Sequence, residues 1–218
     1  MRNYPDVAII AERKKIKSKM ESFWNKRYEL EEYVYGENPN VFFREVLDNL
    51  TPGKILLPAD GEGRNSVYAA SKGWEVDAFD YSRIACEKAL RLAAKVDVKI
   101  NYAQGDILNI KLKDAYYDVL GIFFLHLPSS IRREMHQKLL KSLKPQGLLI
   151  MEVFSKDQLG KQSGGPQEED FLYSLDQLKE DFKMFSFNTF EEISVYLDEG
   201  SFHRGMASTI RVAGVKSQ

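Results

Sequence analysis

The stretch KILLPADGEGRNSVYAASKGWEVDAFDYS, residues 54–82, decides the fold of this chain. It opens with the apolar run KILLP, residues 54–58, which is typical of a buried strand, and the pair Gly61 and Gly63 follows. A helix is predicted over residues 65–72 and a second strand over residues 74–79. Strand, glycine-rich turn, helix and strand make the repeating unit of a parallel sheet, so this stretch predicts an α/β protein.

The remaining elements follow from the same signals on either side. Residues 11–35 are charge-rich and helix-prone, and we interpret them as a solvated helix, with an anion grip or a lid as the alternative. A short helix over residues 41–50 ends at Thr51-Pro52-Gly53, a strong stop signal. Further helices are expected at residues 82–96, 129–144 and 171–182, and further strands at residues 98–103, 117–125, 148–154, 192–197 and 207–215.

This alternation predicts a doubly wound, Rossmann-like sheet that is mostly parallel. Ser82 is expected to cap one helix, and Ser129 or Ser130 the next. The buried stripe of the first of these helices is expected to hold Ala85, Ala89, Leu92 and Val96. Residues 155–170 form a long polar loop, and DEGSFHRG, residues 198–205, joins the last two strands as an antiparallel pair.

Composition excludes several classes of protein. Hydrophobic residues are 44% and charged residues 29% of the chain, which rules out wholesale disorder. The net charge of −1 does not suggest a nucleic-acid binder or a polybasic membrane binder. The single cysteine, Cys86, excludes an intramolecular disulfide and a Cys-rich zinc site, and we expect it in the core. With no membrane-spanning run and no secretory segment in the sequence, we expect a cytoplasmic monomer or homodimer with no bound metal.

The glycine turn is also the expected ligand site. Glycines let the backbone approach a ligand, the helix N-terminus favours negative charge, and Asp80 can accept hydrogen bonds from two ribose hydroxyls. Asp106 follows the third strand at the same edge of the sheet. Two ligands fit: a dinucleotide, which favours GxGxxG, and S-adenosylmethionine, which has no pyrophosphate. Gly61 starts the run GEGRNS, and this run departs from the dinucleotide pattern at its last position.

The sequence then resembles a known family over most of its length. WNKRY, YGENPNVF, DGEGRNSVYAA, FDYS, QGDI, HLPSS, QSGGP and LDEGSFHRGMA are similar to motifs of class I S-adenosylmethionine-dependent methyltransferases, within them the tellurite-resistance and thiopurine methyltransferase group. The resemblance implies a seven-stranded sheet with an antiparallel C-terminal strand. It also implies a single domain with an N-terminal helical cap (residues 1–50), a cofactor-binding core (residues 54–154) and an acceptor-side part (residues 155–218).

The resemblance also implies roles for individual residues. Gly61 and Gly63 would lie against the methionine part of the cofactor, Asp80 would hold the ribose, and Phe124 would approach the methyl group and the acceptor. The full set of residues expected to bind the cofactor is Asp60, Gly61, Gly63, Asn65, Asp80, Tyr81, Asp106, Ile107 and Phe124. Where many members carry an acid and a first glycine, this chain has Leu57 and Ala59, and Asp60 is the neighbouring acid.

Three residues are candidates for the acceptor side. His126 is either a proton acceptor or a hydrogen-bonded structural histidine, and His203 and Arg204 either line the acceptor pocket, with Arg204 as an anion clamp, or lie on the surface. His136 is expected on the surface. The function expected is methyl transfer from S-adenosylmethionine to a small acceptor such as a thiol or a metalloid oxyanion. A cofactor-binding module without catalysis and an NAD-dependent oxidoreductase remain as alternatives.

Overall fold

A computed structural model describes residues 20–217 of the chain. Residues 20–28 are helical; the expected helix between residues 11 and 19 lies outside the described residues. The named helices are α2 (Val41–Leu47), α3 (Arg64–Ser71), α4 (Arg83–Lys95), α5 (Ser129–Ser142) and α6 (Leu175–Asp181), with short turns η1 (Lys156–Gln158) and η2 (Glu169–Phe171). The strands are β1 (Lys54–Pro58), β2 (Glu75–Asp80), β3 (Asn101–Gln104), β4 (Tyr117–Phe123), β5 (Leu143–Phe154), β6 (Phe185–Asp198) and β7 (Arg204–Lys216).

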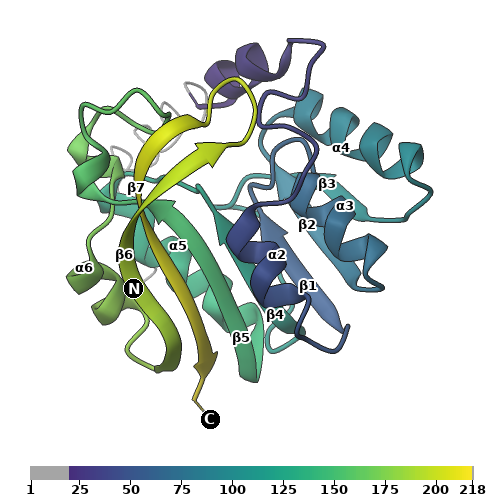
Figure 1. Cartoon of the computed structure of the whole chain (residues 1–218). Coiled ribbons are helices and arrows are strands. Elements are labelled where there is room, and N and C mark those ends of the chain that lie inside the picture. Colours follow the sequence, from purple (N-terminus) through teal and green to yellow (C-terminus); the bar gives the residue numbers. More distant parts are fainter. Residues whose placement is uncertain (1–19, 218) are drawn as a thin grey trace, which may run out of the picture.

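The seven strands form one sheet in the order β3-β2-β1-β4-β5-β7-β6 (Figure 1). The pairs from β3 to β5 are parallel, whereas β7 is antiparallel to both β5 and β6. The predicted fold class is confirmed, including the antiparallel C-terminal strand. The strand order reverses direction between β1 and β4, and ligands of open α/β sheets bind outside the carboxyl ends of the strands at such a point.

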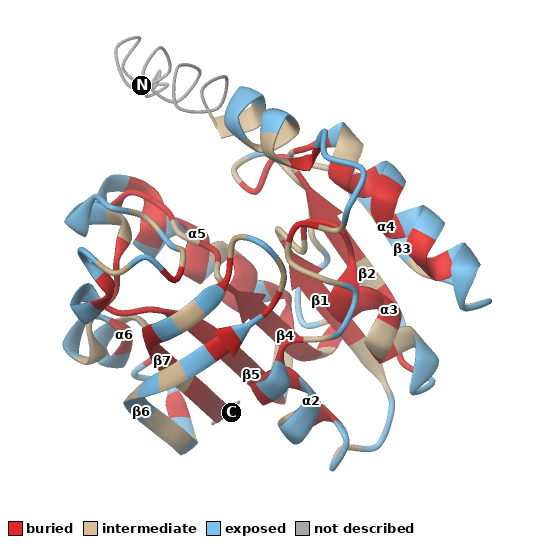
Figure 2. Cartoon of the chain, turned by 45° about the horizontal axis from the view of Figure 1, so that its top comes forward, coloured by how far each residue is buried: buried red, intermediate tan, exposed pale blue. Residues whose placement is uncertain are grey.

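Successive side chains of each strand point to opposite faces of the sheet, so a hydrophobic core forms on each face. On β1, Leu56 points into one hydrophobic cluster with the inner side of α5, while Ile55 and Leu57 point into the other with α2 and α3. Helices α2, α3 and α4 cover one face and α5 and α6 the other (Figure 1). Figure 2 shows the sheet buried and the exposed residues on the outer sides of the helices. Since both faces are covered, the edge at the strands' carboxyl ends is where a ligand can reach the core.

Several element boundaries differ from the prediction. β5 begins at Leu143, not at residue 148, because Leu143 still pairs with Tyr117 before the register shifts between Tyr117 and Val119. β6 begins at Phe185 rather than at residue 192, because a bulge between Phe187 and Thr189 breaks the alternation that a strand signal needs.

Local capping and burial also differ from expectation at three positions. The N-cap of α5 is Pro128, and the hydroxyl of the expected cap Ser129 donates instead to Asp170. Val96 is exposed because it is the C-cap of α4, beyond the buried stripe. His136 is buried, not on the surface, because its ring packs on Tyr173 and Phe182. Ser82 caps α4 and Cys86 is buried, as predicted.

Candidate active site

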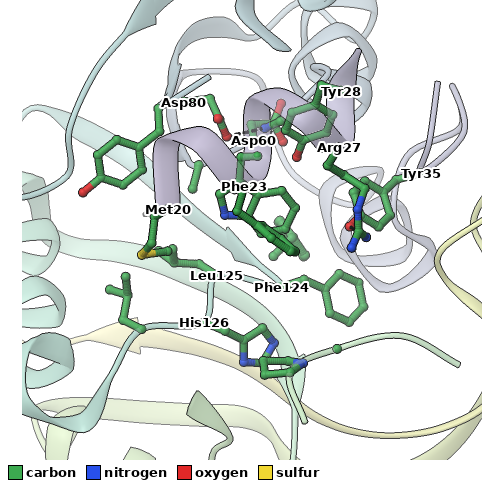
Figure 3. A pocket seen from close by; sticks show the side chains of 18 of the residues that line it. Met20, Phe23, Arg27, Tyr28, Tyr35, Asp60, Asp80, Phe124, Leu125 and His126 are labelled. Atoms are coloured by element: carbon green, nitrogen blue, oxygen red, sulfur yellow. Dashed lines mark hydrogen bonds between the residues drawn. The ribbon is translucent and has the colours of Figure 1, made fainter. Parts of the chain in front are cut away.

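A cavity of about 530 Å³ opens at the carboxyl ends of β1, β2 and β4. Figure 3 shows Asp60 and Asp80, at the ends of β1 and β2, on one side (the acidic end) and Phe124 and His126 on the other (the aromatic end), with Phe23 between them and Tyr28 beside Asp60. The helix at residues 20–28 lies across it and contributes Met20, Phe23, Trp24, Arg27 and Tyr28 to the lining. The cavity has the size of an ordinary small-molecule site.

Gly61 lines the acidic end of the cavity, and hydrogen bonds hold both its N–H and its carbonyl group. Its N–H donates to Asp80 Oδ2 over 3.0 Å, and its carbonyl accepts from the Tyr102 hydroxyl over 2.7 Å. The backbone is left-handed, with φ +57°, and a Cβ here would lie 2.7 Å from the Tyr28 hydroxyl oxygen. Glycine is therefore required at this position for both the turn and the close approach of Tyr28.

Asp60 uses its carboxylate to cap the helix that follows the glycine turn. Oδ2 accepts from the Ser66 N–H at 3.1 Å and from the Ser66 hydroxyl at 2.5 Å, and Oδ1 accepts from the Asn65 amide at 3.0 Å. One backbone N–H in the first turn of α3, that of Ser66, is thus paired with a carboxylate of the chain itself. A negative side chain at this helix N-terminus disfavours a dinucleotide pyrophosphate there, and so the NAD alternative.

Asp80 lies at the end of β2 and is buried. One oxygen accepts from the Gly61 N–H and the other from the Ser82 N–H, which leaves each oxygen a further lone pair for a ligand hydroxyl. Burial raises the pKa of Asp80 to about 6, and it likewise raises the pKa of Asp60 to about 6. Two desolvated carboxylates favour a ligand with hydroxyl donors and positive charge, which S-adenosylmethionine carries and a pyrophosphate does not.

The other residues expected to bind the cofactor divide into two groups. Tyr81 and Ile107 line the cavity, whereas Asp106 and Gly63 do not. Asp106 accepts instead from the Tyr81 hydroxyl at 2.6 Å, so its contact with the cavity is through Tyr81. Gly63 has φ +84°, and a Cβ here would lie 2.5 Å from the Cβ of Ala89; this glycine lets α3 and α4 pack closely rather than touching a ligand.

Phe124 follows β4 with a left-handed backbone at φ +49°, which is unusual for a bulky residue. Its N–H still donates to the carbonyl of Glu152 at 2.8 Å, so the neighbouring strand holds the strained conformation. The Phe124 ring lies 4.7 Å from the ring of Phe154 and 4.5 Å from that of His203. Backbone strain here places an aromatic wall at the cavity, where the sequence analysis expected the methyl acceptor.

His126 lines the cavity, but both of its ring nitrogens are engaged by backbone groups. Nδ1 lies 2.9 Å from the carbonyl oxygen of Phe171, and Nε2 accepts from the Phe154 N–H at 3.4 Å. This fixes a neutral ring with its proton on Nδ1, and burial lowers the pKa of His126 to about 4. The geometry favours the structural alternative for His126 over the proton acceptor.

His203 is the histidine that remains available to a ligand. It lines the cavity and is 6% exposed, and its Nδ1 lies 3.5 Å from Glu199 Oε2. The pKa of His203 is lowered, chiefly by burial and against the pull of Glu199. Arg204, the expected anion clamp, does not line the cavity: its guanidinium is exposed beside Asp198, since alternate residues of a hairpin strand point to opposite sides.

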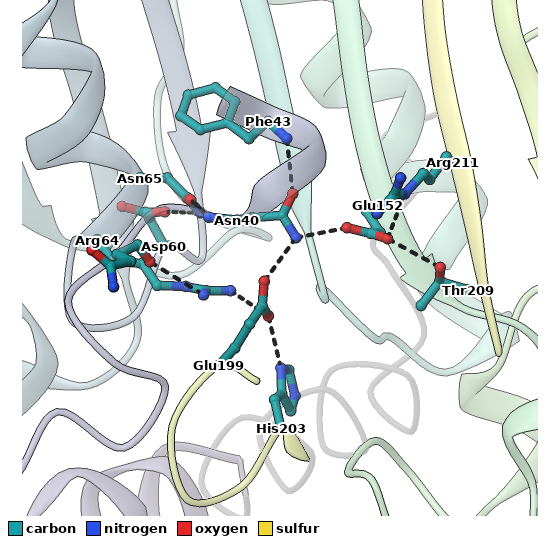
Figure 4. A network of polar contacts seen from close by, with 11 residues as sticks. Asn40, Phe43, Asp60, Arg64, Asn65, Glu152, Glu199, His203, Thr209 and Arg211 are labelled. Atoms are coloured by element: carbon teal, nitrogen blue, oxygen red, sulfur yellow. Dashed lines mark hydrogen bonds and ion pairs between the residues drawn. The ribbon is translucent and has the colours of Figure 1, made fainter. Parts of the chain in front are cut away.

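A buried polar network links His203 to the glycine turn (Figure 4). Glu199 Oε2 accepts from Arg64 Nη2 at 2.8 Å, and Oε1 accepts from Asn40 Nδ2 at 3.2 Å. Asn40 also donates to Glu152 at 2.6 Å. This network was not predicted, because Glu199 lies 159 residues from Asn40 and 135 from Arg64 in the sequence; the local signal was an acid four residues before His203 in the predicted hairpin loop.

Comparison with known proteins agrees with this geometry. Residues 55–147 match a family model described as a methyltransferase domain. No curated protein matches the sequence. Within residues 20–217, no helix is long and apolar enough to cross a membrane, and no group of three or more potential metal ligands is assembled.

Solved structures share the fold at low sequence identity. TehB from Haemophilus influenzae is 20% identical with a TM-score of 0.69, over 90% of this chain and 67% of that one. Magnesium protoporphyrin IX methyltransferase (ChlM) from Synechocystis PCC 6803, with bound SAH, is 17% identical with a TM-score of 0.70, over 92% and 99%. A protein from the study of disulfide-to-thioacetal conversion in echinomycin biosynthesis is 15% identical with a TM-score of 0.72, over 91% and 92%.

The family match, the fold and the position of the buried acids Asp60 and Asp80 at the carboxyl ends of β1 and β2 agree with one another. Residues 55–147 cover β1, β2, β3 and β4 and the turns that carry Asp60 and Asp80. Residues 55–147 are thus similar to a methyltransferase domain, and the chain shares its fold with methyltransferases of solved structure, one of them with SAH bound.

Proposed function

We propose that the chain transfers a methyl group from S-adenosylmethionine to a small-molecule acceptor within this one cavity. The observation that supports the proposal is that a single cavity has an acidic end at Asp60 and Asp80 and an aromatic end at Phe124, Phe154 and His203. The first end suits the cofactor and the second an apolar acceptor, so the two reactants would meet between them.

The chain's residues would act mainly by holding the reactants. S-adenosylmethionine supplies a methyl group already activated on a sulfonium, and the protein contributes proximity and alignment, which can be worth roughly 7–11 kcal/mol. Asp80 would accept from the ribose hydroxyls, and Tyr81 and Ile107 would lie beside the adenine. Trp24 and Tyr28, whose rings stack at 5.6 Å, would cover the cofactor from the helix at residues 20–28 and exclude water.

The aromatic end of the cavity bears on the acceptor class. Phe124, Phe154 and Phe171 line it, and Arg27 is a cation at its rim that also lies 3.9 Å from the ring centre of Phe202. Such walls favour a flat apolar acceptor over a strongly hydrated oxyanion. The likeness to TehB and the motifs DGEGRN and HLPSS support membership of a group related to the tellurite-resistance methyltransferases. The acceptor of this chain would be set by the aromatic lining of its own cavity.

Ligand binding tests the proposal directly. S-adenosylmethionine and S-adenosylhomocysteine, each at about 100 times its dissociation constant, should add roughly 2.7 kcal/mol of stability, or about 5–10 °C in Tm, while NAD should have no effect. Asp80→Ala should weaken binding by well over about 1 kcal/mol. Asp198→Ala, an exposed acid on the β6–β7 hairpin, is the matched control and should leave binding unchanged. A shift with NAD alone would overturn the proposal.

A further inference from the structure

We propose that His203, positioned by Glu199, removes a proton from the acceptor, and that the acceptor is therefore an aryl hydroxyl. This inference rests on the proposed methyl transfer and makes it more specific. Neither residue belongs to the segment that matches the methyltransferase family model, which ends at residue 147.

The carboxylate that orients His203 is itself rigidly held. Glu199 Oε2 faces His203 Nδ1 and accepts from Arg64 Nη2, while Oε1 accepts from Asn40. Both side chains of the Arg64–Glu199 ion pair are less than 10% exposed. A buried carboxylate fixed in this way sets the ring to carry its proton on Nδ1, which leaves the lone pair on Nε2.

The Nε2 side of the ring is kept open. Among the described residues, Nε2 of His203 has no hydrogen-bond partner, in contrast to Nε2 of His126. The loop residue next to this edge of the ring is Gly164, whose φ is +108°. A Cβ at this position would lie 2.7 Å from His203 Cδ2 and 3.4 Å from Nε2. A side chain at residue 164 would also clash with the Phe202 carbonyl oxygen, so the close approach of this loop to the His203 ring requires glycine here.

The surroundings keep the ring in its neutral form, which is the form that can accept a proton. Burial, Arg64 and Arg27 lower the pKa of His203, and Glu199 raises it by less, so the net direction is downward. Tyr35 is the other titratable group packed on the ring, with centroids 4.5 Å apart, and its own pKa is raised, so it stays uncharged. A neutral imidazole at pH 7 is able to accept a proton.

The walls around Nε2 define the shape of the proton donor. The rings of Tyr35, Phe124 and Phe154 surround His203 at centroid distances of 4.5, 4.5 and 5.3 Å. All three rings line the cavity together with His203, so a flat aromatic acceptor bound there would pack against aromatic faces. An aryl hydroxyl has a pKa near that of tyrosine, about 10, and so needs a base at neutral pH, whereas thiols at about 8.5 ionise more readily and oxyanions are already ionised.

The chemical step balances with the groups named. The acceptor hydroxyl gives its proton to His203 Nε2, and its oxygen forms a bond to the methyl carbon while the carbon–sulfur bond of the sulfonium donor breaks and sulfur keeps the electron pair. The products are an aryl methyl ether and S-adenosylhomocysteine, with the proton on the imidazolium beside Glu199.

A matched pair of acceptors tests the inference: 2-naphthol and 2-naphthalenethiol share one skeleton and differ in the nucleophile. His203→Gln should lower kcat for the naphthol about 100-fold or more and should remove the acid limb of its pH profile. The same variant should change kcat for the thiol by less than about threefold. Arg204→Ala, an exposed neighbour, is the control and should change neither rate.

A second measurement determines the protonation state and tautomer of His203 without the need for catalysis. Nitrogen-15 NMR of the free protein should show His203 neutral at pH 7 with the proton on Nδ1, and Glu199→Gln should shift the tautomer balance toward Nε2–H. If Glu199→Gln does not fold because Arg64 is left unpaired, the tautomer in the unmodified protein and the His203→Gln rates still decide. An Nε2–H tautomer in the unmodified protein, equal losses for both acceptors, or methylation of the thiol alone would overturn the inference. Absence of both cofactor binding and methyl transfer would instead overturn the proposed function.

Discussion

Lowering the pH from 7 to 5 should weaken binding of S-adenosylhomocysteine about tenfold, because Asp80 must be ionised to accept from the ribose. Burial places the pKa of Asp80 at about 6. From that pKa, the ionised fraction is about 91% at pH 7 and about 9% at pH 5, a tenfold change that corresponds to about 1.4 kcal/mol. S-adenosylhomocysteine is the better probe, since it lacks the sulfonium charge.

The stability of the free protein should move in the opposite direction. The pKa of Asp80 is about 6 in the folded protein and about 4 in the unfolded chain, so the folded state binds the proton more tightly. Acidification through pH 6 therefore stabilises the free protein through this group. Between pH 7 and pH 5 the contribution of Asp80 is about 1.3 kcal/mol, to be measured as the difference between the unmodified protein and Asp80→Asn.

Isothermal titration at pH 5, 6 and 7 measures the affinity, and Asp80→Asn should bind more weakly at pH 7 with a flat pH dependence. A fall of about a hundredfold would mean that Asp60, whose pKa is also about 6, must ionise as well. An affinity that stays constant or rises toward pH 5 would refute the assignment of Asp80 to the ribose.

Three further changes have defined outcomes. Ala59 has a left-handed backbone at φ +51°, so Ala59→Gly should stabilise the protein by roughly 0.5–1 kcal/mol, seen as a higher Tm; a lower Tm would contradict this. Glu62→Gln should destabilise by roughly 3–5 kcal/mol in denaturant titrations, because the buried Lys88 ammonium would lose its counter-charge and keep only the carbonyls of Leu30 and Glu32; a loss under about 1 kcal/mol would contradict the role of this ion pair. His126→Ala should lower the free energy of unfolding by roughly 2–4 kcal/mol yet leave the pH profile of turnover unchanged. Loss of the acid limb of that profile would show that His126 accepts a proton during turnover.

The strands of the core could be predicted closely because the sequence marks their ends. β1 matches the predicted residues because Pro52-Gly53 precedes it and the glycine turn follows it. Asp80 and Gly61 were predicted at the ligand site for the same reason, since residues at a strand end follow from the position of the strand, and both line the cavity. β6 was found only in its second half, because a bulge interrupts its alternation.

Burial and long-range pairing could not be predicted from local patterns. The sequence analysis expected Gly63 and Asp106 to touch the cofactor, but whether a residue faces a ligand or a neighbouring helix depends on packing. His126 and His203 looked alike in the sequence, and they differ because one ring is closed by two backbone groups and the other is open. Glu199 acquires its role only when the hairpin brings it to Arg64, 135 residues away.

The hairpin of β6 and β7 carries Glu199 and His203 on one short connection, residues 199–203, beyond the part of the chain that matches the methyltransferase family model. The proposed base and the carboxylate that positions it therefore lie in a different segment of the sequence from Asp60 and Asp80, the acids proposed to face the cofactor. Exchanging those five residues for another loop, with Arg64 adapted to the new partner, would alter which nucleophile is methylated while the donor site stays as it is. The molecule is in this sense modular, and its acceptor range is the property most open to redesign.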